Sequence, residues 1–331
     1  MINKNRVEIV AVVGPKGGVG KTSISANLAI ALAKQGKRVV AVDLDLGASN
    51  LNTFLGIRNP KYTLDDFVLN KVGKLEDIVL EINVKGGSPT FNNETSIDNI
   101  GFICGGNIPG IANLHYSKKM KLLRNLSMLE YDFVLLDLGA GASHNVVDFV
   151  LVSQKNLLVT TPEVPSILNT YSFLKTLVFR KLNIAFKELN NQKAIDLLEK
   201  AKDVDKNPQF KKMSDFITII ESIEGGVEAS QLIRKTLLNL KPTMLLNRIR
   251  TVNDEKAGIA IQNLTREYLG IEFVKILHVH EDSCVGNAIA RMRPVMIDNP
   301  LSIFASQINS IAMFLLRNFN SSVNMVLKRY I

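Results

Sequence analysis

The chain has 331 residues, of which 46% are hydrophobic and 6% aromatic, and its formal net charge is +9. Its length and composition agree with one large domain over residues 1–331, and its two cysteines, Cys104 and Cys284, exclude a disulfide framework. No signal peptide or spanning helix is visible, so we expect a cytoplasmic protein, and the positive charge favours anionic partners such as DNA or an acidic membrane surface.

The first predicted element is an apolar strand over residues 7–13, which leads into a glycine-rich turn. The turn and the residues after it read Lys16-Gly17-Gly18-Val19-Gly20-Lys21-Thr22-Ser23. Glycines allow successive backbone N–H groups to converge on phosphates, while Lys21 can reach the β- and γ-phosphate oxygens and Thr22 can offer its hydroxyl to Mg²⁺. A helix expected over residues 21–34 points its positive end at the same place. The pattern predicts a site for ATP or GTP with Mg²⁺, formed by residues 17–23.

Two further apolar strands end in carboxylates. The strand at residues 39–42 leads into Asp43 and Asp45, and the strand at residues 133–136 leads into Asp137. In an open α/β sheet the carboxyl ends of the strands form the ligand crevice, so we expect all three carboxylates near the phosphates. Asp137 suits a cation that keeps part of its hydration shell. An alternative interpretation of Asp45 is that it only caps a turn.

These motifs resemble those of a known family. The string Lys-Gly-Gly-x-Gly-Lys-Thr is similar to the deviant phosphate loop of MinD/ParA-type P-loop ATPases, with Pro15 where the general motif has its first glycine. The strings Asp-x-Asp-x-Gly-x-x-Asn and Asp-x-Gly-Ala-Gly resemble the flagellar FlhG/YlxH branch. The resemblance covers residues 6–175 and 241–316. It implies ATP and Mg²⁺ as cofactors and a slow, partner-stimulated hydrolysis of ATP to ADP and phosphate.

The resemblance also implies roles for single residues. Lys16 would reach across a two-fold interface to the phosphates of a second copy, which couples ATP occupancy to homodimerisation. The catalytic residues would be Lys16, Lys21 and Asp45, and Asp45 would orient the attacking water. The Mg²⁺ network would consist of Thr22, Asp43 and Asp137.

Other positions are assigned in the same way. The resemblance places Asn50, Gly139 and Glu163 on the switch segments 43–50 and 137–143 or on the dimer face. Glu163 belongs to the Thr-x-Pro-Glu turn that follows the strand at residues 157–160. The resemblance implies that Asn247, at the end of the strand over residues 241–247, reads the adenine base with Arg248 beside it. The alternative is that this pair is a solvated strand end.

The apolar runs alternate as strands and helices, which favours a fold of the α/β class. We expect a mostly parallel, doubly wound sheet of about seven or eight strands of the P-loop NTPase type, with helices on both faces. The polar stretch at residues 85–99 predicts a hairpin tip or a surface loop. Residues 180–240 exceed the family's ordinary length and predict a helical insertion of two or three helices. This insertion is either a docking surface or a cover over a sheet edge, and both interpretations stay open.

Several features bear on partners. Residues 318–331 form a C-terminal tail that is interpreted either as a short amphipathic helix for a membrane surface or as a segment packed on the core. The cations Lys118, Lys119, Lys121 and Arg124 are interpreted as one solvated helix face. His278 and His280 are interpreted as lone groups, and we expect no metal except Mg²⁺. The iron–sulfur carrier relatives have a C-x-x-C pair that is absent from this sequence.

The resemblance implies an ATP-driven switch that controls the placement or number of a cellular structure, with flagella favoured. It would cycle between a cytoplasmic monomer and an ATP-bound homodimer. The homodimer would contact either the inner face of the membrane, as a peripheral protein, or a protein partner from the flagellar or division machinery. Two alternatives remain. One is a ParA-like segregation ATPase that binds nonspecific DNA, and the other is a metabolic P-loop enzyme that acts on a small molecule.

Overall fold

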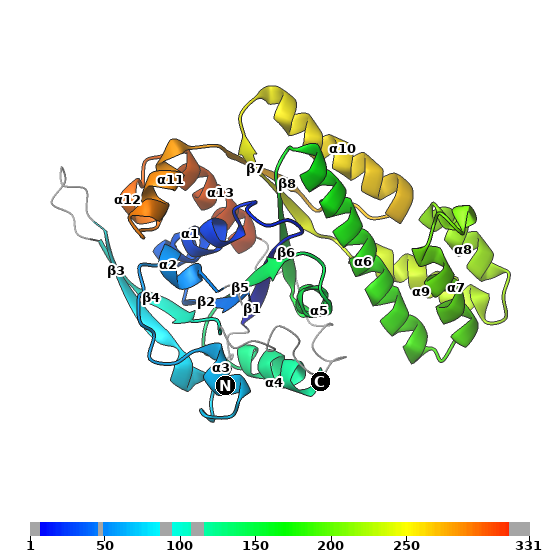
Figure 1. Cartoon of the computed structure of the whole chain (residues 1–331), viewed down its shortest axis with the longest axis horizontal. Helices are drawn as coiled ribbons and strands as arrows, with labels where there is room; N and C mark the ends of the chain where they lie inside the picture. The colour runs from blue at the N-terminus through cyan, green and yellow to red at the C-terminus, as the bar shows by residue number, and fades with distance from the viewer. Residues whose placement is uncertain (1–6, 46–48, 87–94, 107–115, 318–331) are drawn as a thin grey trace.

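One eight-stranded sheet runs through the computed structural model, which describes residues 7–45, 49–86, 95–106 and 116–317 (Figure 1). The strands are β1 (Glu8–Gly14), β2 (Val39–Leu44), β3 (Leu80–Gly86), β4 (Thr95–Ile103), β5 (Phe133–Ala140), β6 (Lys155–Thr160), β7 (Thr243–Ile249) and β8 (Ile276–His280). Their spatial order is β3-β4-β2-β5-β1-β6-β7-β8. Every neighbouring pair is parallel except β3 with β4, which is antiparallel. The predicted fold class is therefore confirmed.

Helices cover both faces of this sheet, because the central strands are buried on both sides. All residues of β1 and β2 are buried, as expected for near-continuous apolar runs in a parallel sheet. The helices of the sheet region are α1 (Lys21–Lys34), α2 (Leu51–Phe54), α3 (Leu64–Val68), α4 (Tyr116–Leu126), α5 (His144–Val152), α6 (Val164–Glu188), α10 (Val252–Leu269), α11 (Ser283–Ala290), α12 (Val295–Asp298) and α13 (Ile303–Arg317). Two short 3₁₀ turns occupy Glu76–Ile78 and Pro208–Phe210. One apolar cluster includes α1, α12 and α13, and the other includes α4, α5 and α6.

The strand order places the ends of three strands together at one point. β1 lies between β5 and β6, and β2 lies on the other side of β5. The loops after β1, β2 and β5 therefore leave the same edge of the sheet, which is where ligands bind in doubly wound folds. The helix predicted over residues 21–34 has these same bounds in the structure.

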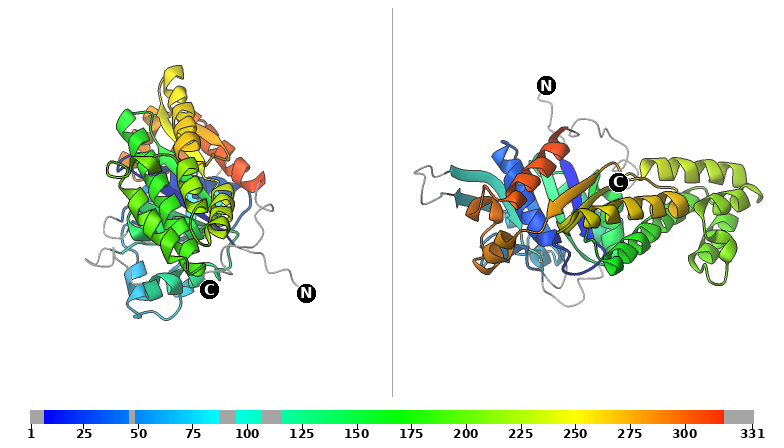
Figure 2. Two further views of the ribbon diagram at one scale, coloured as in Figure 1. Left: turned by 90° about the vertical axis from the view of Figure 1, so that its right-hand side faces the viewer. Right: turned by 90° about the horizontal axis from the view of Figure 1, so that it is seen from above.

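A helical arm extends from the sheet region. It consists of α7 (Gln192–Lys202), α8 (Met213–Glu221) and α9 (Gly226–Asn239), all within residues 180–240. Figure 2 shows these helices standing at the far end of α6, away from the sheet. The arm has its own apolar contacts, such as the edge-to-face pair of Phe210 and Phe216 with ring centroids 5.8 Å apart. Helix α6 runs without a break through Arg180, so the arm begins inside a continuous helix rather than at a loop.

Some predicted features fall outside the described residues. The polar stretch at residues 85–99 contributes the ends of the antiparallel pair β3 and β4, and residues 87–94 between them are outside the description. Residues 318–331, the predicted tail, are outside it as well. Among the helices that the structure describes, none combines the length and the apolar character needed to cross a bilayer.

Candidate functional site

The turn between β1 and α1 has the shape of a phosphate-binding loop. Gly18 and Gly20 have φ angles of 77° and 97°, which only glycine adopts without strain. A Cβ added at Gly17 or Gly18 would meet nothing within 4 Å, so the loop encloses open space on that side. Within the described structure, no side chain caps the N-terminus of α1. Its first backbone N–H groups and the positive end of its dipole therefore suit an anionic ligand.

The two lysines of the loop differ in environment. Lys21 is only 7% exposed, and its charge partly offsets the burial that raises the pKa of Asp45 and of Asp137, so it lies near these carboxylates. Lys16 is exposed. Lys21 thus belongs to the interior of the site, whereas Lys16 is free to meet groups outside its own chain.

Asp137 and Asp43 face each other on neighbouring strands, as the register of β5 and β2 pairs them directly. Asp137 is 1% exposed and accepts a hydrogen bond of 2.8 Å from Ser25 Oγ, and it also accepts one from the Thr22 side chain. Burial raises the pKa of Asp137 to about 7, and the charge of Asp43 adds to this rise against the hydrogen bonds and Lys21. Two buried carboxylates that repel each other favour a cation between or beside them.

Asp43 also fixes the segment that follows β2. Its Oδ2 accepts hydrogen bonds from Ser49 Oγ at 2.7 Å, the Asn50 backbone N–H at 3.0 Å and the Leu51 backbone N–H at 2.9 Å. Its Oδ1 accepts one from the Asp45 backbone N–H at 3.0 Å. Residues 46–48 of this predicted switch segment are outside the description. The contacts at residues 45 and 49–51 show that the Asp43 carboxylate holds both ends of the segment, a role that sequence reasoning missed.

The loop after β5 contacts both the loop after β1 and Asp45. A Cβ at Gly139 would lie 2.8 Å from Asp45 Oδ1, so a larger residue here would displace the carboxylate. The Gly141 backbone N–H donates to the Gly14 carbonyl at 3.4 Å, and Gly141 has a φ of 90°. Burial and the charge of Asp43 raise the pKa of Asp45, against the charge of Lys21. The three predicted motifs therefore meet at one site.

Asn247 and Arg248 lie at the end of β7. Asn247 is 6% exposed, and its Nδ2 donates to the Val19 carbonyl of the phosphate loop at 2.8 Å. Any Cβ at Gly20 would lie 2.4 Å from this amide. Arg248 has a φ of 60° and occupies a bulge, which turns it outward. No local pattern predicts the contact between Asn247 and the loop, and base recognition by Asn247 and Arg248 stays a prediction.

Glu163 lies in the same neighbourhood as Lys16 and Arg248. The pKa of Glu163 is lowered mainly by a hydrogen bond from the Thr161 side chain, and the charges of Lys16 and Arg248 lower it further. Glu163 is exposed at the N-terminus of α6. The structure thus brings Lys16, Glu163 and Arg248 onto one surface beside the phosphate loop.

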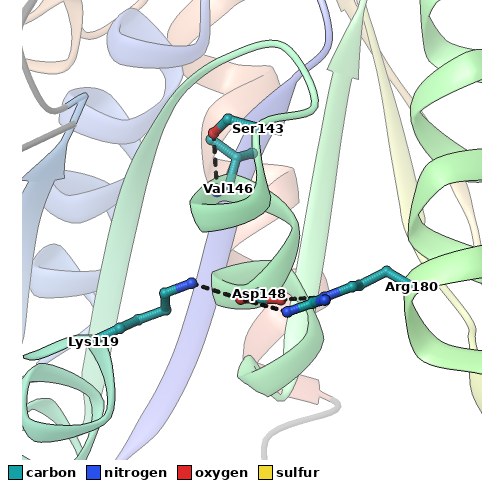
Figure 3. A network of polar contacts seen from close by, with 5 residues as sticks. All are labelled: Lys119, Ser143, Val146, Asp148 and Arg180. Atoms are coloured by element: carbon teal, nitrogen blue, oxygen red, sulfur yellow. Dashed lines mark hydrogen bonds and ion pairs between the residues drawn. The ribbon is translucent and has the colours of Figure 1, made fainter. Parts of the chain in front are cut away.

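A partly buried ion-pair network anchors α5, the helix that follows the β5 loop (Figure 3). Asp148 of α5 accepts hydrogen bonds from Lys119 Nζ of α4 at 2.6 Å and from Arg180 Nε of α6 at 2.9 Å. Burial raises the pKa of Asp148, but these two cations lower it more, so it ends below its usual value. The interpretation of the α4 cations as one solvated face was wrong for Lys119, which is 5% exposed because it lies a third of a turn from Lys118 and points inward.

The donor set fits Mg²⁺ held largely through water and phosphate. Thr22 supplies a hydroxyl, and Asp43 and Asp137 supply oxygens, which are the ligands of a small hard cation. Within the described residues, no three histidine, cysteine, aspartate or glutamate side chains form a metal-binding group on their own. Mg²⁺ usually binds through one or two carboxylates together with substrate phosphates, so we expect the cation to arrive with the nucleotide.

The raised pKa of Asp137 predicts a pH dependence of nucleotide binding. Because the folded state holds this proton more tightly than the unfolded state, the stability contributed by Asp137 is complete below about pH 4 and is lost as the pH rises through 7. A cation bound at Asp137 requires the ionised carboxylate, so the stabilisation that Mg²⁺ adds to the nucleotide-bound protein grows from pH 6 to pH 8. We expect the apparent Mg²⁺ affinity of the ATP-bound protein to rise about tenfold over this range.

The measurement is the melting temperature with ATP, titrated with Mg²⁺ at pH 6, 7 and 8. The control is Asp137→Asn, which has the same shape and does not ionise. ATP titrates in the same range in both proteins, so only the difference between them reports on Asp137. Equal pH profiles for the two proteins would contradict the assignment.

Several curated proteins are similar to this chain in sequence. The chain is 34% identical over 174 residues to "Antiactivator FleN" of Pseudomonas aeruginosa, covering 52% of this chain and 56% of that protein. It is 31% identical over 173 residues to "Flagellum site-determining protein YlxH" of Helicobacter pylori, covering 52% and 54%. A "Septum site-determining protein MinD" of Helicobacter pylori is also 31% identical, over 160 residues, covering 48% and 54%. The chain thus matches just over half the length of these relatives.

The fold is similar to solved structures, and most of the chain matches a known domain family. The fold is similar to MinD of Pyrococcus horikoshii complexed with Mg-ADP, with a TM-score of 0.57, 20% identity, and coverage of 96% of this chain and 100% of that one. It is also similar to a ParA family ATPase of Chlorobium tepidum, with a TM-score of 0.58, 19% identity, and coverage of 93% and 99%. Residues 10–295 match the family described as the CobQ/CobB/MinD/ParA nucleotide binding domain. The chain, with its glycine-rich loop and converging carboxylates, therefore belongs to this family of nucleotide-binding domains.

Proposed function

We propose that this protein is an ATP-hydrolysing switch that binds ATP with Mg²⁺, pairs with a second copy in the ATP state, and controls the placement or number of flagella. One observation carries the proposal. The segments after β2 and β5 both contact the phosphate-loop region, through Lys21 beside Asp45 and Asp137 and through the bond from Gly141 to Gly14. A change at the γ-phosphate would therefore reach both segments directly.

Binding follows from the loop and the interior lysine. The backbone N–H groups of residues 17–23 would surround the phosphates, and Lys21 would contact the β- and γ-phosphate oxygens. Thr22, Asp43 and Asp137 would hold Mg²⁺, which, when bound, neutralises phosphate charge during phosphoryl transfer. Asn247 would keep the loop in shape through Val19, and with Arg248 it would border the base.

Hydrolysis requires an oriented water and a cation for the developing charge. Asp45 is half-buried beside Gly139, and its raised pKa favours it as the group that positions the water. Lys16 would supply positive charge from the partner copy, the task that an arginine finger has in other NTPases. Because Lys16 is exposed and unconstrained by the interior of its own site, it suits this role in trans.

The surface around Lys16 supports association with a second copy. Val164 and Leu168, one turn apart at the start of α6, are 71% and 58% exposed, and Glu163 precedes them. Apolar side chains next to a cation and a carboxylate form a surface that can match itself across a two-fold axis. We propose that this face, together with the segment containing Asn50 and the loop at Gly139, forms the ATP-dependent dimer interface.

The biological role is tested by sedimentation with two anionic surfaces. The full chain would be mixed with vesicles that contain anionic lipid, or with nonspecific duplex DNA, in ADP and in ATP with Mg²⁺. We expect ATP-dependent retention on vesicles, weakened by Val326→Ser/Leu327→Ser in the tail. ATP-dependent, salt-sensitive retention on DNA instead would support the ParA-like segregation role. Retention on neither surface would contradict the membrane contact and leave a protein partner as the target.

A further inference from the structure

A groove lies at the β8 edge of the sheet, away from the phosphate loop. It is bounded on one side by β8 and on the other by α13, with a volume of about 960 Å³. Residues that line it include Lys275, Leu277, Leu301, Met313, Phe314 and Arg317. Two strands, β6 and β7, lie between β8 and β1, the strand that leads into the phosphate loop. None of these residues has a role in the proposed nucleotide binding, so the groove is a separate feature of the surface.

The backbone of β8 has an open side along this groove. β8 is the last strand of the described sheet, and the carbonyl of Lys275, the residue just before β8, accepts a hydrogen bond from the Met244 N–H of β7 at 3.0 Å. Backbone groups alternate along a strand, so residues 275, 277 and 279 face β7, whereas residues 276, 278 and 280 face outward. The outward His280 N–H donates to Gln307 Oε1 of α13 at 2.8 Å, which confirms this phase. The backbone groups of Ile276 and His278 therefore face the open edge.

The side chains of the groove combine apolar surface with two cations. Leu301 is 97% exposed and Met313 is 40% exposed, a large exposure for aliphatic side chains that line a hollow. Lys275 and Arg317 are both exposed and make no ion pair with another described residue, and no carboxylate lines the groove. The edge thus offers backbone hydrogen bonds, an apolar surface and uncompensated positive charge in one place.

We propose that the β8 edge and its groove bind an extended, acidic segment of a partner protein by strand addition. The segment would pair its backbone with Ile276 and His278 and place alternate apolar side chains over Leu277 and Met313. Its carboxylates would meet Lys275 and Arg317. Main-chain pairing supplies affinity in this mode, and the side-chain pockets and charges supply selectivity.

Charge argues against two other occupants. Residues 318–331 contain Lys328 and Arg329 and no aspartate or glutamate, so this segment would add cations to the cations of the groove. A second copy that paired β8 with β8 would bring a second Lys275 and a second Arg317 to one seam without carboxylates. An acidic partner segment is the occupant that balances the charge.

The test uses the full chain in ADP and a set of fluorescent decapeptides. The peptides place Val, Ile or Leu at alternate positions and Asp, Lys or Ser between them, in both chain directions. Binding is measured by fluorescence anisotropy. We expect the Asp-containing peptides to bind at least about tenfold more tightly than the Lys-containing ones. N-methylation of alternate peptide backbone nitrogens should remove binding, because it blocks strand pairing without changing the protein.

Two variants locate the site on the chain. His278→Pro removes an N–H that faces outward and breaks no hydrogen bond to β7, and edge strands tolerate proline at such positions. We expect this variant to bind the acidic peptides about tenfold more weakly, or worse. Lys275→Glu/Arg317→Glu should reverse the charge preference. The matched control is Lys235→Glu/Lys241→Glu, which changes the same number of exposed cations elsewhere and should leave the preference unaltered. Melting temperatures of all variants establish that they fold.

Several results would overturn the proposal. These are binding by none of the peptides, equal binding of Asp- and Lys-containing peptides, or binding that N-methylation leaves intact. A synthetic peptide of residues 318–331 that binds more tightly than the acidic set would identify the chain's own tail as the occupant. A concentration-dependent doubling of mass in ADP that Lys275→Glu/Arg317→Glu changes would identify a second copy.

Discussion

Lys21→Ala is expected to weaken ATP binding by more than about a hundredfold. Lys21 is nearly buried between the phosphate loop and the carboxylates of Asp45 and Asp137. Its loss would remove the cation that meets the phosphates and would leave two acidic groups facing them without compensation. Calorimetric titration with a slowly hydrolysed ATP analogue and Mg²⁺ measures the affinity.

The matched control for this variant is Lys34→Ala. Lys34 occupies the last turn of the same helix, where its Nζ donates to the Met296 carbonyl at 2.8 Å. Its removal costs one hydrogen bond far from the loop, so we expect a modest fall in melting temperature and an unchanged ATP affinity. Nucleotide affinity that survives Lys21→Ala would refute the assignment of the loop as the phosphate site.

Asp45→Asn is expected to lower the rate of ATP hydrolysis by about 10²–10⁴-fold while ATP binding changes only a few fold. The amide keeps the shape that fits against Gly139, but it is a far weaker base than the carboxylate and cannot orient the water in the same way. The loss therefore falls on the chemical step. Phosphate release under single-turnover conditions separates this step from binding.

Asp132→Asn provides the comparison for Asp45→Asn. Asp132 precedes β5 at the opposite end of the strand, where its Oδ2 accepts from the Arg38 backbone N–H at 2.8 Å. It carries the same change in charge but lies away from the phosphate loop, so hydrolysis should continue at the wild-type rate. If Asp45→Asn released phosphate as fast as Asp132→Asn, another group would have to position the water.

Much of the site could be predicted because it depends on local patterns and on one rule of topology. The string of residues 16–22 predicts a loop and a helix, and the structure has that helix over Lys21–Lys34. Asp43 and Asp137 come together because the carboxyl ends of adjacent parallel strands share an edge of the sheet. No long-range information beyond the strand order is needed for this step.

The remaining features depend on contacts between distant segments. Asn247 donates a hydrogen bond to the Val19 carbonyl, 228 positions away in the sequence, and no local pattern predicts that bond. Lys119 looks like its solvated neighbours on α4 until Asp148 and Arg180 are packed beside it. The arm was expected from its length and periodicity, but α6 continues through Arg180 because no glycine or proline stops it there.

We propose that ATP holds two copies of the chain together through Lys16. The most direct test is the molar mass in solution by light scattering, in ADP and in ATP with Mg²⁺, with Asp45→Ala to slow hydrolysis. We predict a doubling of mass only in ATP, and its loss when Lys16→Ala is added, since Lys16 is exposed and its truncation leaves the fold intact. A monomeric mass in ATP, or a doubling that persists with Lys16→Ala, would rule out an ATP-dependent dimer that depends on Lys16.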